Sequence, residues 1–313
     1  WVLGLDGGLT TETGLPFPVA GALRLDGQAR FHPLKFLYRL AAPLRIYEHT
    51  RVLTVQDGTL TTEYGAVHAE KVVFACHFPF VNHPGYYFMR MHQERSYCIA
   101  VQGAQPLEGT YLGIDEDGLS FRQAGKFLLV GGGTHRTGDN RQGGQFANLE
   151  ARAQEFWPEC KIAARWSAQD CMPMDGIPYI GAFSSETPNW FVATGFRKWG
   201  ITSAMAAARL LTAQMQGEPA ESRALFSPQR FRPSASAAQL FRDTAEAARG
   251  ISRTAFGLPR AVADALPPGH GGIVSVQGEK LGVHKAKNGD TFAIDPRCPH
   301  LGCQLEWNPD SLS

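Results

Sequence analysis

Residues 190–203 read Trp-Phe-Val-Ala-Thr-Gly-Phe-Arg-Lys-Trp-Gly-Ile-Thr-Ser. The apolar run Trp190–Ala193 predicts a buried β-strand, and the glycines after it predict a tight loop. A helix is expected over Thr202–Gln216, because Ala, Met and Leu dominate there and Gly217 stands where a C-terminal stop is expected. A strand, a glycine loop and a helix in this order indicate a mixed α/β architecture.

The composition is that of an ordinary globular protein. Hydrophobic residues make up 43% of the 313 residues, charged residues make up 19%, and the formal net charge is +1. A charge so close to zero argues against broad attraction to nucleic acid or to an anionic membrane. No apolar run of about 18 residues occurs, so no membrane span is expected. Four of the six cysteines are isolated, without a disulfide-framework pattern, and indicate a reducing, cytoplasmic setting.

Strands and helices are expected to alternate along residues 1–226. Strands rich in β-branched and aromatic residues are predicted at Thr50–Gln56, Lys71–Ala75, Ser96–Val101, Thr110–Ile114 and Phe127–Val130. Apolar residues at helical spacing predict helices at Phe36–Ala42 and Gln145–Trp157.

The sequence changes character after residue 226. An Ala-rich helix is predicted to run to about Arg249, and we interpret residues 227–266 as a linker that contains it. Three short strands are then predicted, at Gly272–Gln277, Lys280–Lys285 and Thr291–Ile294. We therefore expect a small all-β domain over residues 267–313.

A possible metal-binding loop, Cys298-Pro299-His300-Leu301-Gly302-Cys303, follows these strands. A cysteine and a histidine two residues apart on a tight loop can both reach one metal site. Thiolate suits iron and zinc, and a neutral imidazole removes negative charge from the site. Taken alone, a C-x-H-x-x-C pattern is also compatible with a zinc half-site or with chance.

The same loop resembles the first ligand loop of Rieske domains, C-x-H-x-G-C. The resemblance implies that Cys298 and His300 are ligands of a [2Fe–2S] cluster. It also places Cys303 where many members have a cysteine that pairs with one in the second loop. The second loop, C-x-C-H, does not occur up to Ser313. The chain is therefore expected to supply only half of the cluster ligands and to form no stable cluster alone.

Residues 1–226 resemble the D-amino-acid-oxidase-like superfamily of FAD enzymes, and more closely its bacterial members with a C-terminal Rieske domain. The resemblance rests on five blocks in order: FHPLKFL at 31–37, ERSY at 94–97, RWSAQD at 165–170, PYIG at 178–181 and ATGFRKWG at 193–200. It implies an FAD and substrate domain with a largely antiparallel substrate-side sheet. The G-x-G-x-x-G turn that holds the FAD pyrophosphate does not occur. We therefore expect the Rossmann segment to lie outside this chain and the fragment itself to be inactive.

By this resemblance, the loop and helix start after residue 194 contact the flavin. The implied residues are Gly195, Lys198, Trp199, Gly200 and Ile201, with further contacts from Val52, Ala75, Cys76 and Gly181. A helix start carries partial positive charge and free N–H groups, which suit the negative charge of reduced flavin around N1 and the C2 carbonyl. Lys198 would add a full charge there. The alternative is a packed strand–turn–helix with a solvent-facing lysine, and plain core strands at the remaining positions.

Substrate-side candidates are polar residues within the family-like blocks. They are His32, Arg95, Gln169 and Lys198, followed by Asp170 and His135. An arginine that faces the flavin would hold a substrate carboxylate through two hydrogen bonds. The alternative for each is an ordinary hydrogen-bonded core residue, and His32 could equally cap a turn before Pro33.

Two functions from different classes follow. The first is an FAD-dependent oxidoreductase that oxidises a small organic substrate, such as an amine or amino acid, by hydride transfer. A Rieske [2Fe–2S] cluster would then pass electrons singly to an acceptor protein or small molecule. The second is a non-catalytic or degenerate flavoprotein-fold module that binds a partner. The first is preferred because the flavin-side blocks are intact.

Overall fold

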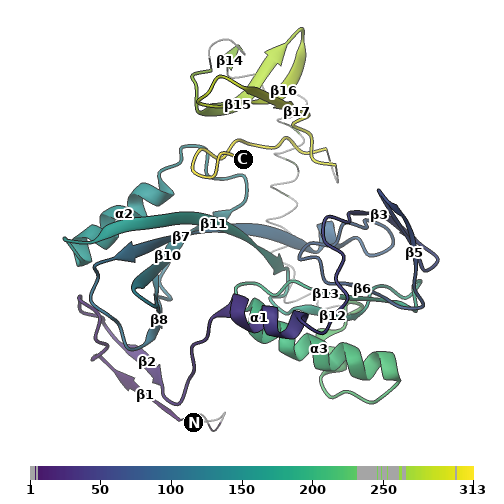
Figure 1. Ribbon diagram of the computed structural model, residues 1–313, viewed down its shortest axis with the longest axis horizontal. Coiled ribbons are helices and arrows are strands. Elements are labelled where there is room, and N and C mark those ends of the chain that lie inside the picture. The colour runs from purple at the N-terminus through teal and green to yellow at the C-terminus, as the bar shows by residue number, and fades with distance from the viewer. Residues whose placement is uncertain are drawn as a thin grey trace. The chain divides into compact units, whose positions relative to one another are not determined.

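The computed structural model describes residues 4, 6–230, 245, 248, 252, 261–262, 266–299 and 302–313 (Figure 1). It is a mixed α/β protein, as the sequence predicts. The chain divides into two compact units. The first comprises Trp1–Ile46, Ser96–Thr134 and Gly144–Ala168, and the second comprises Tyr47–Arg95, His135–Gly143 and Gln169–Ser313.

Most of a five-stranded sheet, in the order β11–β7–β10–β9–β8, lies in the first unit. Its strands are β7 (Met91–Gln102), β8 (Thr110–Leu112), β9 (Ser120–Ala124), β10 (Phe127–Arg136) and β11 (Lys161–Pro173). Strands β8, β9 and β10 form an antiparallel meander, as expected for a substrate-side sheet. The unit also contains β1 (Gly7–Thr10), β2 (Ala22–Leu25), α1 (Pro33–Ala41) and α2 (Gln145–Phe156).

The core of the first unit follows the period of two that β-strands impose on side chains. Tyr97, Ile99 and Val101 alternate along β7 and are all buried. Leu149 and Ala153, four residues apart on α2, pack in the same cluster. Burying one such large apolar side chain contributes about 1.5–3 kcal/mol, so this cluster holds α2 on the sheet.

Two three-stranded sheets belong to the second unit. One has the order β12–β13–β6 and the other β3–β4–β5. Their strands are β3 (Val52–Gln56), β4 (Thr59–Thr62), β5 (Gly65–His68), β6 (Val72–Phe74), β12 (Tyr179–Ala182) and β13 (Trp190–Thr194). Strand β13 pairs antiparallel with β12 and parallel with β6. The helical elements of this unit up to residue 230 are η1 (Tyr87–Met89), α3 (Gly200–Gln216) and α4 (Arg223–Phe226).

Helix α3 packs against the β12–β13 face. Ala207 and Leu211, four residues apart, are buried in a cluster with Ile180, Phe191 and Ala193 of those strands. The helix ends at Gly217, whose φ of 76° allows its N–H to reach the carbonyls of the last turn. This pairing fixes the N-terminal end of α3 beside the end of β13.

A four-stranded sheet in the order β14–β15–β16–β17 follows later in the chain. Its strands are β14 (Ala261–Val262), β15 (His270–Val276), β16 (Glu279–Lys285) and β17 (Thr291–Ile294). We call residues 266–313 the C-terminal module. Its small core contains Leu266, Val274 and Val283, all buried.

The long helices α2 and α3 lie where they were predicted, whereas other elements differ from the prediction. Helix α1 starts three residues before the predicted one, because Pro33 occupies its first turn and His32 caps it. Strand β10 was predicted to end at Val130 but continues to Arg136. Strand β11 was not predicted at all. The predicted linker helix falls mainly outside the described residues, and the two boundaries between the three predicted segments stay predictions.

Candidate functional site

The conformation of the loop after β13 requires a glycine at its first position. Gly195 has φ 72°, and a Cβ there would lie 2.5 Å from Pro173 Cγ. Glycine is therefore required both by the backbone conformation and by the lack of space. The preceding Thr194 is buried, and its hydroxyl donates to the His77 carbonyl. Arg197 also has a left-handed φ, 53°, and its N–H donates to the Cys171 carbonyl at 3.1 Å. These contacts hold the loop in one arrangement ahead of α3.

The N-terminal end of α3 presents backbone amides. Its first i to i−4 hydrogen bond runs from the Ser203 N–H to the Trp199 carbonyl at 2.9 Å. The amides of Gly200 and Ile201 precede that bond and have no acceptor within the helix. A Cβ on Gly200 would meet nothing within 4 Å, so this backbone borders open space. Such an end attracts negative charge.

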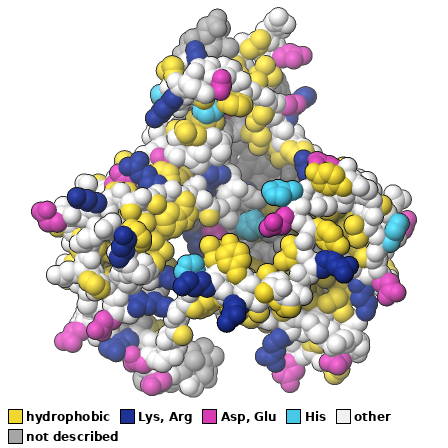
Figure 2. Space-filling model, viewed as in Figure 1, with side chains coloured by type: hydrophobic (Ala, Val, Ile, Leu, Met, Phe, Trp, Pro, Cys, Tyr) yellow, Lys and Arg dark blue, Asp and Glu magenta, His cyan; other side chains and the backbone are white. Residues whose placement is uncertain are grey.

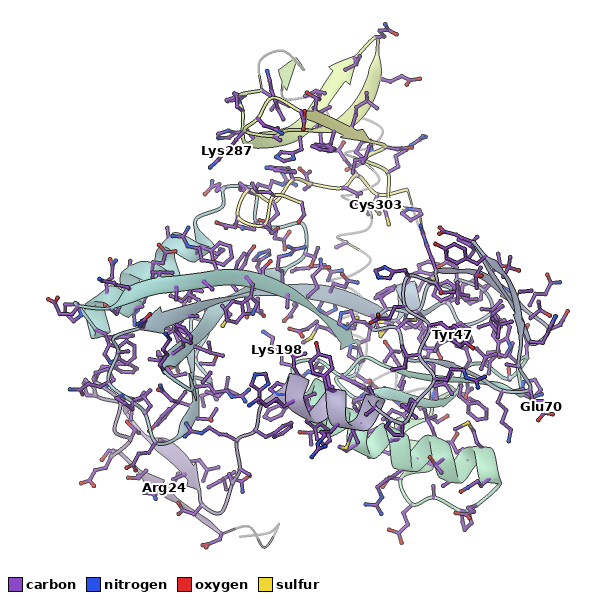
Figure 3. All side chains as sticks on the ribbon, in the orientation of Figure 1. Arg24, Tyr47, Glu70, Lys198, Lys287 and Cys303 are labelled. Carbon is purple, nitrogen blue, oxygen red and sulfur yellow. The ribbon has the colours of Figure 1, made fainter. Side chains whose placement is uncertain are left out.

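Lys198 of this loop, labelled in Figure 3, has charged neighbours. The Lys198 Nζ lies 3.9 Å from Glu94 Oε2, and His92 Nε2 lies 3.6 Å from Glu94 Oε1. The hydrogen bond with His92, assisted by Lys198, holds the pKa of Glu94 below its ordinary value. Burial instead raises the pKa of Asp170, although Lys198 and His77 oppose that rise. The site thus combines a readily ionised carboxylate with one that resists ionisation.

A cavity of about 300 Å³ adjoins the same loop. It is lined by Gly176, Pro178, Ile180, Phe196, Arg197, Trp199, Thr202, Ser203, Ala206 and Phe226. Arg197 is the charged member of this mainly apolar lining. A guanidinium in such a place can bind a carboxylate through two parallel hydrogen bonds.

The structure places the predicted flavin-side residues in several elements of the second unit. Gly195, Lys198, Trp199, Gly200 and Ile201 form the loop and the start of α3. Val52 opens β3, and Ala75 and Cys76 directly follow β6. Gly181 lies within β12, where its φ is 145° and a Cβ would lie 3.1 Å from Pro228 Cδ. Their roles as cofactor contacts stay predictions.

The predicted substrate-side residues are more scattered. His32 belongs to the first unit, where its Nδ1 accepts a 3.4 Å hydrogen bond from the Lys35 N–H as the cap of α1. Gln169 donates from Nε2 to Thr137 Oγ1 at 3.1 Å, and Arg95 follows Glu94 along β7. His135 lies near the end of β10, with Nδ1 2.7 Å from the Arg136 carbonyl oxygen. Their catalytic roles stay predictions.

Sequence reasoning missed Glu94, His92 and Arg197. Arg197 lies inside the 193–200 block, so its position next to Lys198 was an available signal. Glu94 lies in the 94–97 block, but its contact with Lys198 joins residues far apart in the sequence. Only the folded chain reveals that pairing.

The Cys298 loop is closed by backbone hydrogen bonds. The Cys298 N–H donates to the Cys303 carbonyl at 2.8 Å, and the Gly302 N–H donates to the Cys298 carbonyl at 2.9 Å. Burial raises the pKa of the Cys303 thiol. His300 lies outside the described residues. The roles of Cys298 and His300 as iron ligands stay predictions.

Among the described residues, no helix has the length and apolar character needed to cross a membrane. On the face shown in Figure 2, side chains of both charges are interspersed.

Comparison with known proteins identifies relatives of this chain. A protein of Bacillus subtilis (strain 168) bears the name Rieske 2Fe-2S iron-sulfur protein YhfW. It is 31% identical to this chain over 321 residues, which cover 98% of this chain and 63% of that protein. Glycine oxidase from Geobacillus kaustophilus is 25% identical with a TM-score of 0.51, over 59% of this chain and 53% of that one. L-Amino acid deaminase from Proteus myxofaciens, solved in complex with anthranilate, is 18% identical with a TM-score of 0.54, over 73% and 68%.

The chain spans 63% of the curated relative and 53% of the glycine oxidase. A family model described as DAO, FAD dependent oxidoreductase, matches residues 5–214, which include the loop after β13 and the start of α3. The chain therefore belongs to the DAO family of FAD-dependent oxidoreductases.

Proposed function

We propose that this chain provides the substrate side and part of the flavin site of an enzyme that oxidises a small amine bearing a carboxylate, such as an amino acid. The observation that carries the proposal is the loop from Gly195 to Gly200. It joins an amide-rich helix start, an arginine on a cavity wall and a lysine within one short stretch. Each of these matches one requirement of flavin-dependent amine oxidation.

The residues of this loop fit a flavin. Open space beside Gly200 lets a flat ring approach the backbone. The amides of Gly200 and Ile201 would donate to the edge of the ring that becomes negative on reduction. Lys198, held near Glu94, adds positive charge close to the same amides. When bound, FAD would supply the acceptor for a hydride from the substrate carbon, and the one accompanying proton would leave the substrate nitrogen by way of Asp170.

Arg197 and the carboxylates supply complementary charges for the substrate. Arg197 on the cavity wall would bind the carboxylate. Glu94, held ionised by His92 and Lys198, would attract a protonated amine. Asp170, whose raised pKa makes it a better proton acceptor than an ordinary aspartate, would take up a proton as the amine is oxidised. The glycine oxidase and L-amino acid deaminase relatives support an amino-acid substrate.

A Rieske cluster is the proposed electron acceptor of the flavin. The support is the loop of Cys298 and His300 together with the name of the Bacillus relative. When bound, such a cluster removes the two electrons of substrate oxidation singly and passes them to a one-electron acceptor, either a protein or a small molecule.

Anaerobic titration of the intact protein with amino acids and simple amines tests this function. We expect flavin absorbance bands that bleach with an amino acid and bleach much less with the matching amine that lacks the carboxylate. Arg197→Met should raise the half-saturating amino-acid concentration about 10- to 100-fold, as loss of a charged hydrogen-bonded pair predicts. The same variant should leave the response to the carboxylate-free amine unchanged. A protein without flavin bands would refute the enzyme function.

A further inference from the structure

One loop of the flavoprotein part makes specific contacts with the C-terminal module. We call residues Thr137–Gly143 the docking loop and residues Glu306–Asp310 the C-terminal segment; both belong to the second unit. The side chain of Asn140 is buried, and its Nδ2 donates to Asp310 Oδ2 at 2.8 Å and to Asn308 Oδ1 at 3.3 Å. Arg141 Nη2 lies 3.1 Å from Glu306 Oε1, and both side chains are largely shielded from solvent. Charge-assisted contacts of this kind are specific because a wrong partner would leave buried polar groups unpaired.

The backbone of the docking loop is shaped for the same neighbour. Gly143 has φ 73°, and a Cβ there would lie 2.7 Å from Pro309 Cγ. Gly138, at the other end of the loop, also has a positive φ, 100°, but nothing lies within 4 Å of its Cβ position. The two glycines have the same backbone requirement, and only Gly143 leaves room for the C-terminal segment.

The C-terminal segment is held rigidly by its own module. The Trp307 ring stacks on the His284 ring of β16, with centroids 4.9 Å apart and planes 26° apart. A Cβ on Gly271 of β15 would lie 2.5 Å from the same indole. The Asp310 N–H donates to Asn308 Oδ1 at 3.0 Å, which closes a turn around Pro309. Contacts at this segment therefore fix the β-sheet behind it as well.

The first residue of the docking loop is hydrogen-bonded to strands of the candidate site. The Thr137 N–H donates to the Gln93 carbonyl at 2.9 Å, and Thr137 Oγ1 accepts from Gln169 Nε2 at 3.1 Å. Gln93 and Gln169 directly precede Glu94 and Asp170 along β7 and β11. A module bound to this loop is thus anchored to the strands that carry the site's two carboxylates.

We propose that the docking loop is the binding surface for the C-terminal module, with Asn140, Arg141 and Gly143 as positioning residues that hold the module next to the candidate site. The proposal rests on the proposed function only in giving this module a redox role. The docking itself is a contact between described residues and requires neither flavin nor iron.

Hydrogen exchange of the intact protein tests the docking. Arg141→Glu and Glu306→Arg should each speed amide exchange about tenfold in both the docking loop and the C-terminal segment, since each places like charges together. The double variant, Arg141→Glu with Glu306→Arg, should restore slow exchange. Unchanged exchange in α3 would show that the variants are folded. Failure of the double variant to restore protection, with α3 intact, would overturn the proposal.

The two glycines give an independent test. Gly143→Ala should release both segments to the same extent as the charge variants, whereas Gly138→Ala should leave the C-terminal segment protected. Equal release by the two alanine variants would refute a role for the Pro309 contact.

A redox readout separates this proposal from the proposed function. In the single charge variants, substrate should bleach the flavin at the normal rate while reduction of the cluster slows about tenfold, and the double variant should recover it. If the charge swap restores exchange protection in a protein that lacks flavin and iron, the docking stands and the proposed function fails. If cluster reduction stays normal when protection is lost, the positioning role fails.

Discussion

The Lys198 side chain is only partly engaged by its contact with Glu94. It lies 3.9 Å from Glu94 and has 41% of its side chain exposed, so it is neither free in solvent nor locked in a buried pair. Such a residue can follow a change of charge nearby, because its ammonium reorients at little cost.

Replacing Lys198 should therefore change the flavin potential and not flavin binding. Lys198→Met should lower the two-electron potential by roughly 30 mV, which is equivalent to about 1.4 kcal/mol, and slow substrate-driven reduction. Lys198→Arg keeps the charge and serves as the control. Anaerobic spectroelectrochemical titration of the intact protein measures the effect. An identical potential in the Met and Arg variants would mean that Lys198 faces away from the flavin.

Glu94 should make stability depend on pH in a defined direction. Its pKa is lower in the folded state, chiefly through the His92 hydrogen bond. The resulting stabilisation is complete above the unfolded pKa of about 4.3 and is lost as the pH falls through the folded value. Glu94→Gln should thus lower the urea midpoint at neutral pH and have a diminishing effect on acidification. The exposed Glu70→Gln is the control, and a pH-independent difference for Glu94→Gln would contradict the expectation.

At the scale of elements, the β13–α3 junction depends on two glycines with different demands. Gly195→Ala should destabilise the protein by about 1–3 kcal/mol, because φ 72° is strained for alanine and the added Cβ would overlap Pro173. Gly200→Ala places a Cβ in open space at a helix start, so stability should be unchanged or slightly higher. FAD affinity should nevertheless fall, because the methyl group occupies the space offered to the ring. Thermal unfolding and FAD titration separate the two effects.

The turn that lines the cavity is held by a buried ion pair. Arg230 and Asp175 have side chains only 5% and 4% exposed, joined by contacts of 2.6 and 2.7 Å. Although burial alone would raise it, the pKa of Asp175 is lowered by these hydrogen bonds. Asp175→Asn should cost about 3–5 kcal/mol, since it leaves the Arg230 charge buried without its partner. The exposed pair Arg297–Asp295 provides the control, where Asp295→Asn should leave the midpoint of denaturant titrations almost unchanged.

Elements with strong local signals could be predicted from the sequence, and those defined by distant pairing could not. Helix α3 has a helix-forming composition and a glycine stop, so its prediction succeeded. Strand β11 contains residues such as Ala, Arg and Gln with little strand preference, and becomes a strand by joining the five-stranded sheet. The loop at 195–200 was singled out from its motif, and its flavin contacts stay a prediction. The Glu94–Lys198 contact was missed because no local pattern joins the two residues.

At the scale of the whole molecule, the flavin and iron–sulfur parts should lose function independently. Cys298→Ser should remove iron and reduce electron delivery to an external one-electron acceptor, while the flavin spectrum and substrate-driven bleaching remain. Cys98→Ser, which alters a cysteine outside the proposed metal loop, should leave the iron content unchanged. Iron analysis and paramagnetic resonance of anaerobically prepared intact protein are the measurements. Zinc in place of iron would refute the electron relay.

The anchoring of Arg230 also bears on how tightly the docking loop must bind the C-terminal module. Arg230 donates to the carbonyls of Pro178, Phe226 and Ser227 as well as to Asp175, so the point from which the chain leaves for the C-terminal module is fixed. A covalently tethered module stays at an effective concentration in the millimolar range. Half-occupancy at about 1 mM corresponds to only about 4 kcal/mol of binding free energy. Contacts as few as those of Asn140, Arg141 and Gly143 are therefore enough to keep the module bound for much of the time.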